Sequence, residues 1–359
     1  MKYWRGYLVA AIIAACTWGL RSFSQAHTKL VDMIYPYVTR MMVGHLTEWS
    51  SSVGFSVWQV ALYCGIIIAL ALVVIMVVRH WNPIRLGGWI LTAISVISLL
   101  NTVLYGLNEF AGPLSEDLRL EVISDSPAPE DLEAAAIYYR DQANLLADQV
   151  ERNDDDELSD EDFADLAKQA GNGFDHLVYE EGYSVFAGSK VPVKQMNAAG
   201  KYVTGKTVAL TGESTVNPKL PATVLPYAMC HEMAHRMCIA IDRDADFAAF
   251  LAATANDSPQ FRYSGYVMAY RACLRELEQT MTSSTLDKIR AGESKNLRQD
   301  LDFQDDYFGN HQEADPEVTN LLVLWYVDSQ VLPTVEEEDV RFDPTDETQV
   351  DLSGIVNAR

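Results

Sequence analysis

Three long apolar stretches near the N-terminus constrain the fold more than any other feature of the sequence. They cover Gly6–Leu20, Phe55–Val78 and Leu86–Leu107, and the last two have no charged residue inside. Each of these two is long enough to cross about 30 Å of hydrocarbon. The first is shorter and fits either a signal peptide or an anchor, but it lacks a clear small-x-small cleavage site and Arg21 follows it, which favours an anchor. We therefore predict a membrane domain of residues 1–110 with three transmembrane helices.

Positive charges predict how these helices are oriented. The short loop between the second and third stretches contains Arg79 and Arg85, and Lys2 and Arg5 precede the first stretch. Short basic segments stay in the cytoplasm. Three spans with a cytoplasmic N-terminus place everything after residue 110 outside. We expect a multi-pass protein of the cell membrane, in contact with the lipid bilayer, with an extracytoplasmic domain.

The charge of the chain is divided unevenly. Residues 1–110 contain seven Lys and Arg and three Asp and Glu, a net charge of +4, which leaves −27 for residues 111–359 out of a total of −23. An acidic domain of this kind would repel phosphates, so we expect no nucleic acid as a partner. The charge does not select a substrate and agrees equally well with a role in solubility.

The pattern after the membrane domain predicts a fold that is mainly α with a small β-sheet (α+β). Residues 111–178 form an acidic helical segment, with a first helix over 128–152 and a second opened by Ser159 and Asp162. Residues 179–332 form the next domain. Short β-branched and aromatic segments at 183–186, 191–193 and 207–211 predict its sheet. Residues 333–359 form an acidic tail, expected to be flexible.

The segment His231-Glu232-Met233-Ala234-His235 has the spacing of a zinc site. It lies in a run from Tyr227 to Ile241 without Gly or Pro, which predicts a helix. Histidines four residues apart then share one face, where two imidazole nitrogens can bind one Zn²⁺. Glu232 lies about 100° around the helix, too far for a ligand but within reach of a water that the metal activates. This is the metallopeptidase arrangement of two ligands and a general base, although short motifs also arise by chance.

A catalytic zinc ion usually has three protein ligands. One group of zinc peptidases takes the third from a histidine six residues after the second, but here that position is Ile241. Acids follow at Asp242, Asp244 and Asp246, in and before a second apolar-periodic stretch. We predict Asp244 as the third ligand, with Asp242 as an N-cap and Asp246 as a solvated acid. Cys230 is a weaker candidate because it points elsewhere on the helix.

Several short sequence motifs, taken in their order along the chain, resemble those of a known family. They are Cys230–His235, then Asp244–Phe247, then Tyr263–Tyr266 with the sequence Tyr-Ser-Gly-Tyr. Less securely, Leu107–Leu114 and Thr211–Asn217 also look like family segments. The chain is similar to a bacterial membrane family of unknown function that joins three N-terminal transmembrane helices to a gluzincin-like domain with the H-E-x-x-H motif. This resemblance spans most of the chain and weakens toward the C-terminus. It implies a zincin-like metallopeptidase domain in residues 179–332, and the activity of that family is itself inferred from its motif.

Three residues depart from the family pattern. Asp244 stands where the family has Glu, Cys238 stands where it usually has Gly, and Arg236 stands where it prefers an uncharged residue. Asp is one methylene shorter than Glu, so a ligand at position 244 requires a closer approach of its helix to the metal. These departures leave room for a site that is structural or lost.

The sequence predicts a zinc metallopeptidase that hydrolyses protein or peptide substrates outside the cytoplasm. His231, His235 and Asp244 would hold Zn²⁺, and Glu232 would take a proton from water and pass it to the leaving amine. Candidates for binding the substrate or its oxyanion are Tyr263, Tyr266 and His311, with a buried structural tyrosine as the commoner fate. Two alternatives stay open: a non-catalytic membrane protein with a structural or degenerate zinc site, and a metal-dependent hydrolase of other substrates.

Two further points concern strands and cysteines. The segment Thr211–Asn217 could bind an extended substrate through its backbone or be a plain structural strand. Cys16 and Cys64 fall in the predicted spans and are expected to act as small apolar residues. Cys230 and Cys238 are about 12 Å apart along one helix, too far for a disulfide with each other. Either could pair with Cys273, which the sequence does not decide.

Overall fold

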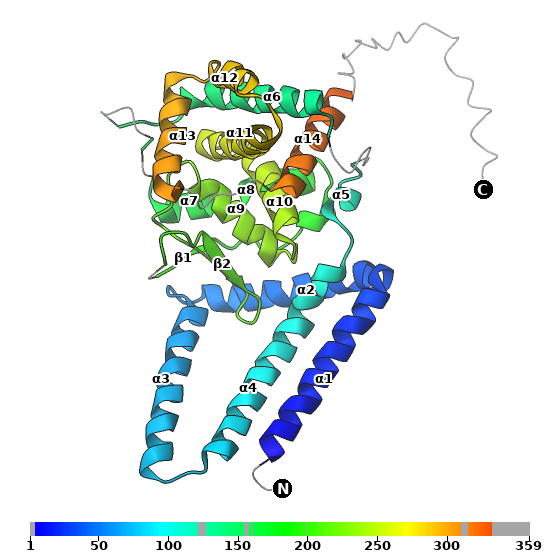
Figure 1. Cartoon of the computed structure of the whole chain (residues 1–359), viewed down its shortest axis with the longest axis vertical. Helices are drawn as coiled ribbons and strands as arrows, with labels where there is room; N and C mark the ends of the chain where they lie inside the picture. Colours follow the sequence, from blue (N-terminus) through cyan, green and yellow to red (C-terminus); the bar gives the residue numbers. More distant parts are fainter. Residues whose placement is uncertain are drawn as a thin grey trace, which may run out of the picture.

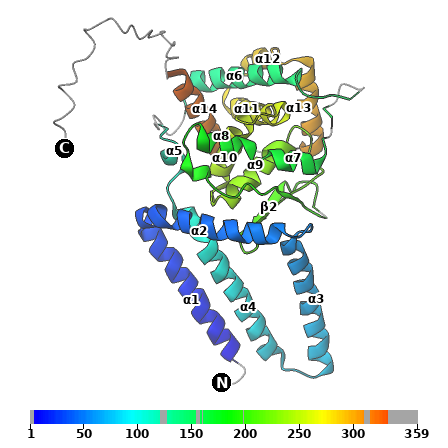
Figure 2. The same cartoon turned by 180° about the vertical axis from the view of Figure 1, so that it is seen from behind.

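The computed structural model describes residues 4–120, 127–153, 158–159, 161–197, 199–309 and 315–331. It is mainly helical with a small three-stranded sheet, as the sequence predicts. Four N-terminal helices form one end of the molecule, and a helical domain stands on them at the other end (Figures 1 and 2). The predicted tail of residues 333–359 lies outside the described residues.

Three of the N-terminal helices are long and apolar enough to span a membrane, which agrees with the prediction. They are α1 (Arg5–Ala26), α3 (Val57–Val78) and α4 (Pro83–Leu104). Helices α1 and α4 pack closely where Gly6 meets Gly88, because a Cβ atom on Gly6 would lie 2.5 Å from the Gly88 carbonyl carbon. Small residues allow such close approach between membrane helices. The N-terminal end of α1 and the loop between α3 and α4 lie at the same end of the molecule (Figure 1).

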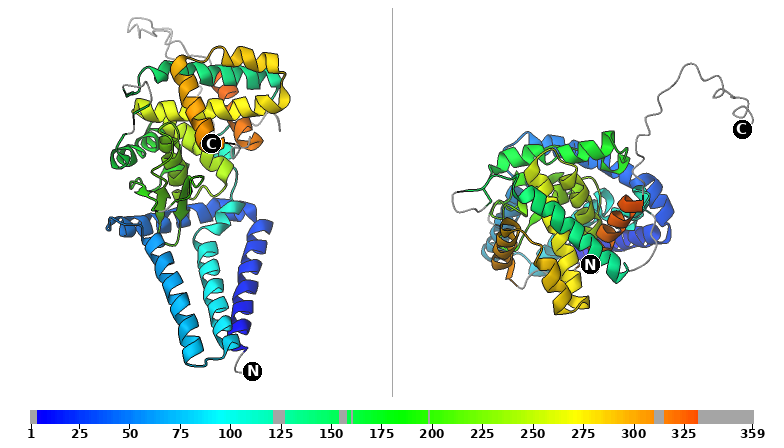
Figure 3. Two further views of the ribbon diagram at one scale, coloured as in Figure 1. Left: turned by 60° about the vertical axis from the view of Figure 1, so that its left-hand side comes forward. Right: turned by 90° about the horizontal axis from the view of Figure 1, so that it is seen from above.

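Helix α2 (Thr28–Ser51) was not anticipated from the sequence. It runs across the ends of α1, α3 and α4, between these helices and the domain (Figure 3). The domain is fastened to it through the Thr47 hydroxyl, which donates to the Gly212 carbonyl at 2.6 Å. A second connection joins the domain to α3, where buried Glu213 accepts from the first two free amides, Val57 at 2.9 Å and Trp58 at 2.8 Å. A carboxylate at a helix N-terminus satisfies amides that have no partner within the helix.

The sheet has the order β1-β3-β2, with β1 (Lys194–Gln195) parallel and β2 (Gly205–Val208) antiparallel to the central β3 (Glu213–Val216). Its place just before the motif helix agrees with the prediction, but two of the predicted strands are wrong. Residues 184–186 form the 3-10 helix η2 (Ser184–Phe186), and 191–193 precede β1 without joining it. Both stretches are apolar, and short apolar runs without a partner strand do not distinguish strand from buried loop.

The rest of the domain is helical. Helix α11 (Pro259–Thr280) packs along α6 (Pro129–Ala147) and against α9 (Leu225–Arg236) and α10 (Asp242–Thr254), while α14 (Pro316–Val331) closes the same core from the side. The first predicted helix ends earlier than expected, at Ala147, and the second is capped by Asp162 rather than Ser159. The remaining elements are η1 (Gly106–Phe110), α5 (Leu114–Asp117), α7 (Phe163–Gln169), α8 (Asn172–Tyr179), α12 (Ser283–Arg290) and α13 (Lys295–Phe308).

Candidate metal centre

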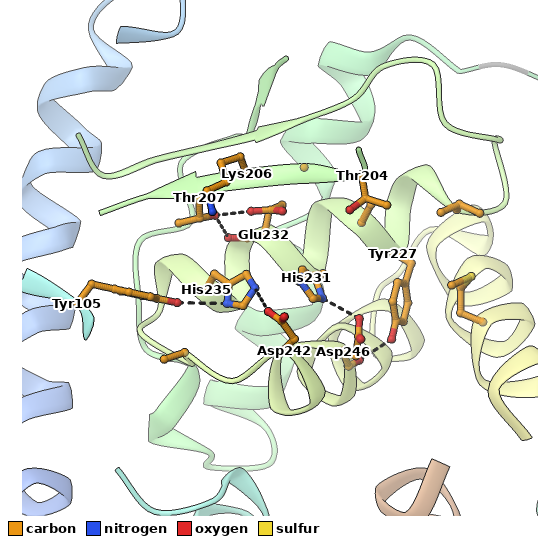
Figure 4. A pocket seen from close by; sticks show the side chains of 15 residues that line it. Tyr105, Thr204, Lys206, Thr207, Tyr227, His231, Glu232, His235, Asp242 and Asp246 are labelled. Atoms are coloured by element: carbon orange, nitrogen blue, oxygen red, sulfur yellow. Dashed lines mark hydrogen bonds and ion pairs between the residues drawn. The ribbon is translucent and has the colours of Figure 1, made fainter. Parts of the chain in front are cut away.

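Helix α9 carries the His-Glu-x-x-His motif and ends directly after it. Pro226 lies in its first turn, where a missing amide proton costs nothing, and Arg236 is its last residue. Cys238 follows with φ = +70°, the left-handed conformation that commonly ends a helix. His231 and His235 lie one turn apart on the same face, with ring centroids 4.6 Å apart (Figure 4). The two histidines therefore share one helical face as predicted, although the helix ends at Arg236 and not at the predicted Ile241.

His231 is oriented by α10. Its Nδ1 lies 2.7 Å from Asp246 Oδ1, so a protonated Nδ1 donates to this carboxylate and leaves Nε2 free toward the cavity. Burial lowers the pKa of His231, but the charges of Asp246, Glu232 and Asp242 outweigh it and raise the pKa to about 9. A carboxylate on the outer nitrogen of a histidine is a recurrent support for metal ligands. Asp246 is thus a partner of the site rather than the solvated acid that the sequence suggested.

His235 is oriented by a backbone carbonyl. Its Nδ1 lies 2.8 Å from the Ile239 oxygen, which can only accept, so Nδ1 carries the proton and Nε2 again faces the cavity. The Tyr105 hydroxyl lies 3.3 Å from the same oxygen and 3.2 Å from Nδ1. Tyr105 directly follows the last residue of α4. The end of this apolar helix therefore contacts the Ile239 carbonyl that orients His235. Burial raises the pKa of Tyr105 well above its usual value, so the hydroxyl keeps its proton.

Asp242 is the acid that joins the two histidines. His231, His235 and Asp242 each offer a ligand atom, and these atoms lie within 4.8 Å of one another. The Asp242 Oδ1 atom is 3.3 Å from His235 Nε2, close to the spacing of about 3.3 Å between two ligands in a tetrahedral zinc site with bonds near 2.05 Å. The hydrogen bond from His235 lowers the pKa of Asp242, which keeps the carboxylate ionised. Two imidazoles and one carboxylate are a donor set that fits Zn²⁺.

The structure does not bring Asp244 to the histidines. Helix α10 begins at Asp242, and about 100° per residue puts Asp246 back on the same face but turns Asp244 to the opposite one. There the buried Asp244 carboxylate accepts weakly from the Leu114 amide and from Arg243, both at 3.4 Å. Asp244, the predicted third ligand, therefore does not lie with the two histidines, and Asp242 is the acid that does. The N-cap prediction for Asp242 is also wrong, because Ile241 holds that position.

Glu232 projects toward the sheet. Its Oε2 atom accepts from the Thr207 hydroxyl at 2.6 Å, and the Ser214 hydroxyl donates to its backbone carbonyl at 2.8 Å. Gly205 lies against the carboxylate, since a Cβ atom there would be 2.5 Å from Glu232 Oε1. The Glu232 carboxylate is thus held between strand β2 and the two histidines, with space that only a glycine leaves (Figure 4).

These groups line one cavity of about 520 Å³. Its wall includes strand β2, the start of α10, Tyr105 and Tyr227, and Tyr227 donates to the Asp246 carbonyl at 2.7 Å. Sequence reasoning missed both tyrosines and Thr207. The spacing of four between Asp242 and Asp246, equal to that of the histidines, could have indicated the acids. For Tyr105 and Thr207 the sequence carried no local signal, because they reach the site through contacts across 130 and 25 residues.

The other predicted site residues lie elsewhere. Tyr263 is buried and donates to Asp300, which Arg152 also holds by two hydrogen bonds. Tyr266 packs among the rings of Tyr138, Tyr139 and Phe250. Neither tyrosine lines the cavity, and His311 lies outside the described residues. The cysteines Cys16, Cys64, Cys230, Cys238 and Cys273 are all free, so no pairing with Cys273 is formed.

Comparison with known proteins adds one family. No curated protein and no solved structure matches the chain. The model of a family described as protein of unknown function (DUF3810) matches residues 31–323. The matched span begins inside α2 and includes the rest of that helix, α3, α4, the sheet and every residue of the candidate metal centre. The chain therefore belongs to the DUF3810 family of proteins of unknown function.

Proposed function

We propose that the protein is a membrane-anchored zinc metallopeptidase that hydrolyses peptide bonds of protein or peptide substrates outside the cytoplasm. One observation carries the proposal: ligand atoms of two histidines and Asp242 converge within 4.8 Å in a cavity that also holds the Glu232 carboxylate. A Zn²⁺ ion bound there would act as a Lewis acid and lower the pKa of a water molecule. His231, His235 and Asp242 would hold the ion.

Glu232 is suited to be the general base. One of its carboxylate oxygens, Oε2, accepts the Thr207 hydroxyl, and the other, Oε1, lies against Gly205 in the cavity that both residues line. That oxygen can take a proton from water as the water attacks the peptide carbonyl, and return it to the leaving amine. The Tyr105 and Tyr227 hydroxyls donate to the backbone carbonyls of Ile239 and Asp246, the two residues that orient the histidines. We therefore assign these tyrosines a positioning role.

Strand β2 is the better candidate for binding an extended substrate. The predicted segment Thr211–Asn217 contains β3, whose two edges are both paired within the sheet. Strand β2 is paired on one side only, and residues 204–207 line the cavity. The Asn217 amide bonds the Thr204 carbonyl, so in an antiparallel ladder the backbone groups of Gly205 and Thr207 point away from β3. They are free to pair with a peptide backbone by strand addition.

The orientation follows from the charges. The basic loop between α3 and α4 lies at the end of the molecule away from the domain (Figure 1). A cytoplasmic loop then puts the cavity outside. In intact cells, protease added from outside after the outer barrier is permeabilised should cleave the domain, and full protection would refute this orientation.

The test of the enzyme is zinc content and cleavage by the full-length protein, purified without chelator. We expect one zinc per chain, loss of zinc in His231→Ala, and retention of zinc with loss of peptide cleavage in Glu232→Gln. The matched control is His176→Ala, which removes a histidine that also contacts acids but lies outside the cavity. Absence of zinc from the wild-type protein would overturn the proposal. Zinc without cleavage of any peptide would favour the alternative of a structural site.

A further inference from the structure

Helix α2 carries an unusual row of exposed apolar side chains. These residues follow the spacing of three and four that marks one face of a helix. The apolar row consists of Leu30, Met33, Ile34, Tyr37, Val38, Met41 and Met42, which are 41–64% exposed. By contrast, the described part of the chain after residue 110 exposes five large apolar residues, which are scattered: Leu145, Tyr179, Tyr202, Val203 and Phe303. A contiguous row of this size marks an interaction surface.

The opposite face of α2 contacts the rest of the protein. Thr39 is buried and shares a hydrogen bond with Asn108. Arg40 donates to the Met237 carbonyl at 3.0 Å and to the Ser184 carbonyl at 3.2 Å, and Thr47 donates to Gly212. The polar side of α2 therefore faces the domain, and its apolar row faces the side of the membrane helices.

The ends of α2 fix its direction relative to the membrane. A single residue, His27, separates it from α1, and five residues separate it from α3. Both junctions lie at the same end of these two helices (Figures 1 and 3). If α1 and α3 span the bilayer, both ends of α2 lie at one surface, so a helix of about 36 Å must lie along that surface.

We infer that α2 lies in the plane of the membrane surface, with the apolar row in contact with the lipid at the boundary of headgroups and acyl chains. Lipid is the occupant because the row continues the apolar surface of α1 and α3, between whose ends it lies. The row has no charged member, while Tyr37 and the exposed Trp49 are residue types typical of the interface. Helix α2 then lies between the bilayer and the domain, and it holds the cavity close to the membrane surface. This inference does not depend on zinc or on peptidase activity.

Spin labels can measure the depth of the row. The full-length chain with Cys16→Ala and Cys64→Ala removes the exposed cysteines, and the other three are buried. Single variants Met33→Cys, Tyr37→Cys and Met41→Cys place a nitroxide on the row, and Asp32→Cys places one on the other side of the same helix. The protein is reconstituted into vesicles of phosphatidylethanolamine and phosphatidylglycerol. We expect oxygen to relax the three row labels more than a water-soluble nickel chelate does, and the reverse at position 32.

Two results would overturn the inference. The nickel chelate could be the better relaxer at the row, which would place the row in water. Alternatively, spin–spin broadening at the row that vanishes on dilution with unlabelled protein would place a second copy of the chain there. The wild-type protein provides a test without variants, using a lipid with a photoreactive acyl chain. Besides the membrane-spanning helices, adducts should map to Leu30–Met42 and not to exposed Phe303 or Tyr202 of the domain, and labelling of the domain without labelling of Leu30–Met42 would contradict the inference.

Discussion

The two histidines of the candidate metal centre are oriented by different regions of the molecule. Asp246, which belongs to the domain, supports His231. The Ile239 carbonyl orients His235 by accepting from its Nδ1. The same carbonyl also accepts from the hydroxyl of Tyr105, which lies at the end of α4. The loop after α9 is also held by Arg40 of α2 through the Met237 carbonyl. One half of the site is thus built within the domain, and the other half depends on the membrane helices.

This difference predicts unequal sensitivity of the two halves. A carboxylate is a stronger acceptor than a carbonyl, so the His231 side relies on one strong bond. The His235 side relies on a network that joins α2, α4 and α9. Damage to the first should be local, whereas damage to the second should also report on how the domain sits on the membrane helices.

The largest expected effect on zinc affinity distinguishes Asp242 from Asp244, two acids in the first turn of α10. Asp242→Ala removes a proposed ligand next to His235, and we expect zinc affinity to fall more than about 100-fold, beyond the range typical of supporting residues. Asp244→Ala is the matched control on the opposite face, and its zinc affinity should stay within a few-fold of wild type. Competition with a metal-binding dye measures both. A larger loss in Asp244→Ala would restore the original assignment of that residue.

The next effect concerns the support of His231. Asp246→Ala leaves Nδ1 without its acceptor, and we expect zinc affinity to fall about 10–100-fold, as for other supporting carboxylates. Asp257→Ala, which removes an exposed partner of His176, is the control and should leave zinc affinity unchanged. Equal affinities for Asp246→Ala and wild type would show that the bond does not orient the ligand. Titration by isothermal calorimetry distinguishes these outcomes.

Smaller effects on stability and zinc affinity are expected for the two tyrosines of the cavity. Tyr105→Phe and Tyr227→Phe each delete one hydroxyl that bonds a backbone carbonyl, and each should cost about 1 kcal/mol of stability. Zinc affinity should fall less than about 10-fold in both, because Ile239 and Asp246 still bond the histidines. Thermal unfolding and metal titration check this. A zinc loss in Tyr105→Phe as large as that in Asp246→Ala would mean that α4 controls the site more than its geometry indicates.

The smallest effect tests the end of α9. Cys238 has φ = +70°, where glycine is unstrained and other residues are not. We expect Cys238→Gly to be more stable than Cys238→Ala by about 1 kcal/mol, since both remove the thiol and only one removes the strain. Chemical denaturation of the two variants measures the difference. If Ala is as stable as Gly, the left-handed conformation is not maintained in solution.

The departures from the family pattern now have structural explanations. The positive φ of Cys238 is one that glycine adopts without strain, which fits the glycine that the resemblance led us to expect at that position. Asp244 lies away from the histidines, so its shorter side chain has no bearing on a metal ion that the histidines would hold. The buried guanidinium of Arg236 donates to the Ser189 and Val191 carbonyls, and burial lowers its pKa to about 10. It braces the loop before β1 and takes no part in the cavity.

The sequence by itself determined the features that depend on local spacing. A run of about 20 apolar residues predicts a membrane helix wherever it lies, and His231 and His235 share a face of any helix that contains them. Only the tertiary structure decided the rest. The start of α10 selected Asp242 and Asp246 over Asp244, and contacts across 130 and 25 residues brought Tyr105 and Thr207 to the site. The physical reason is that periodicity fixes which residues share a face, whereas packing of distant segments fixes what that face meets.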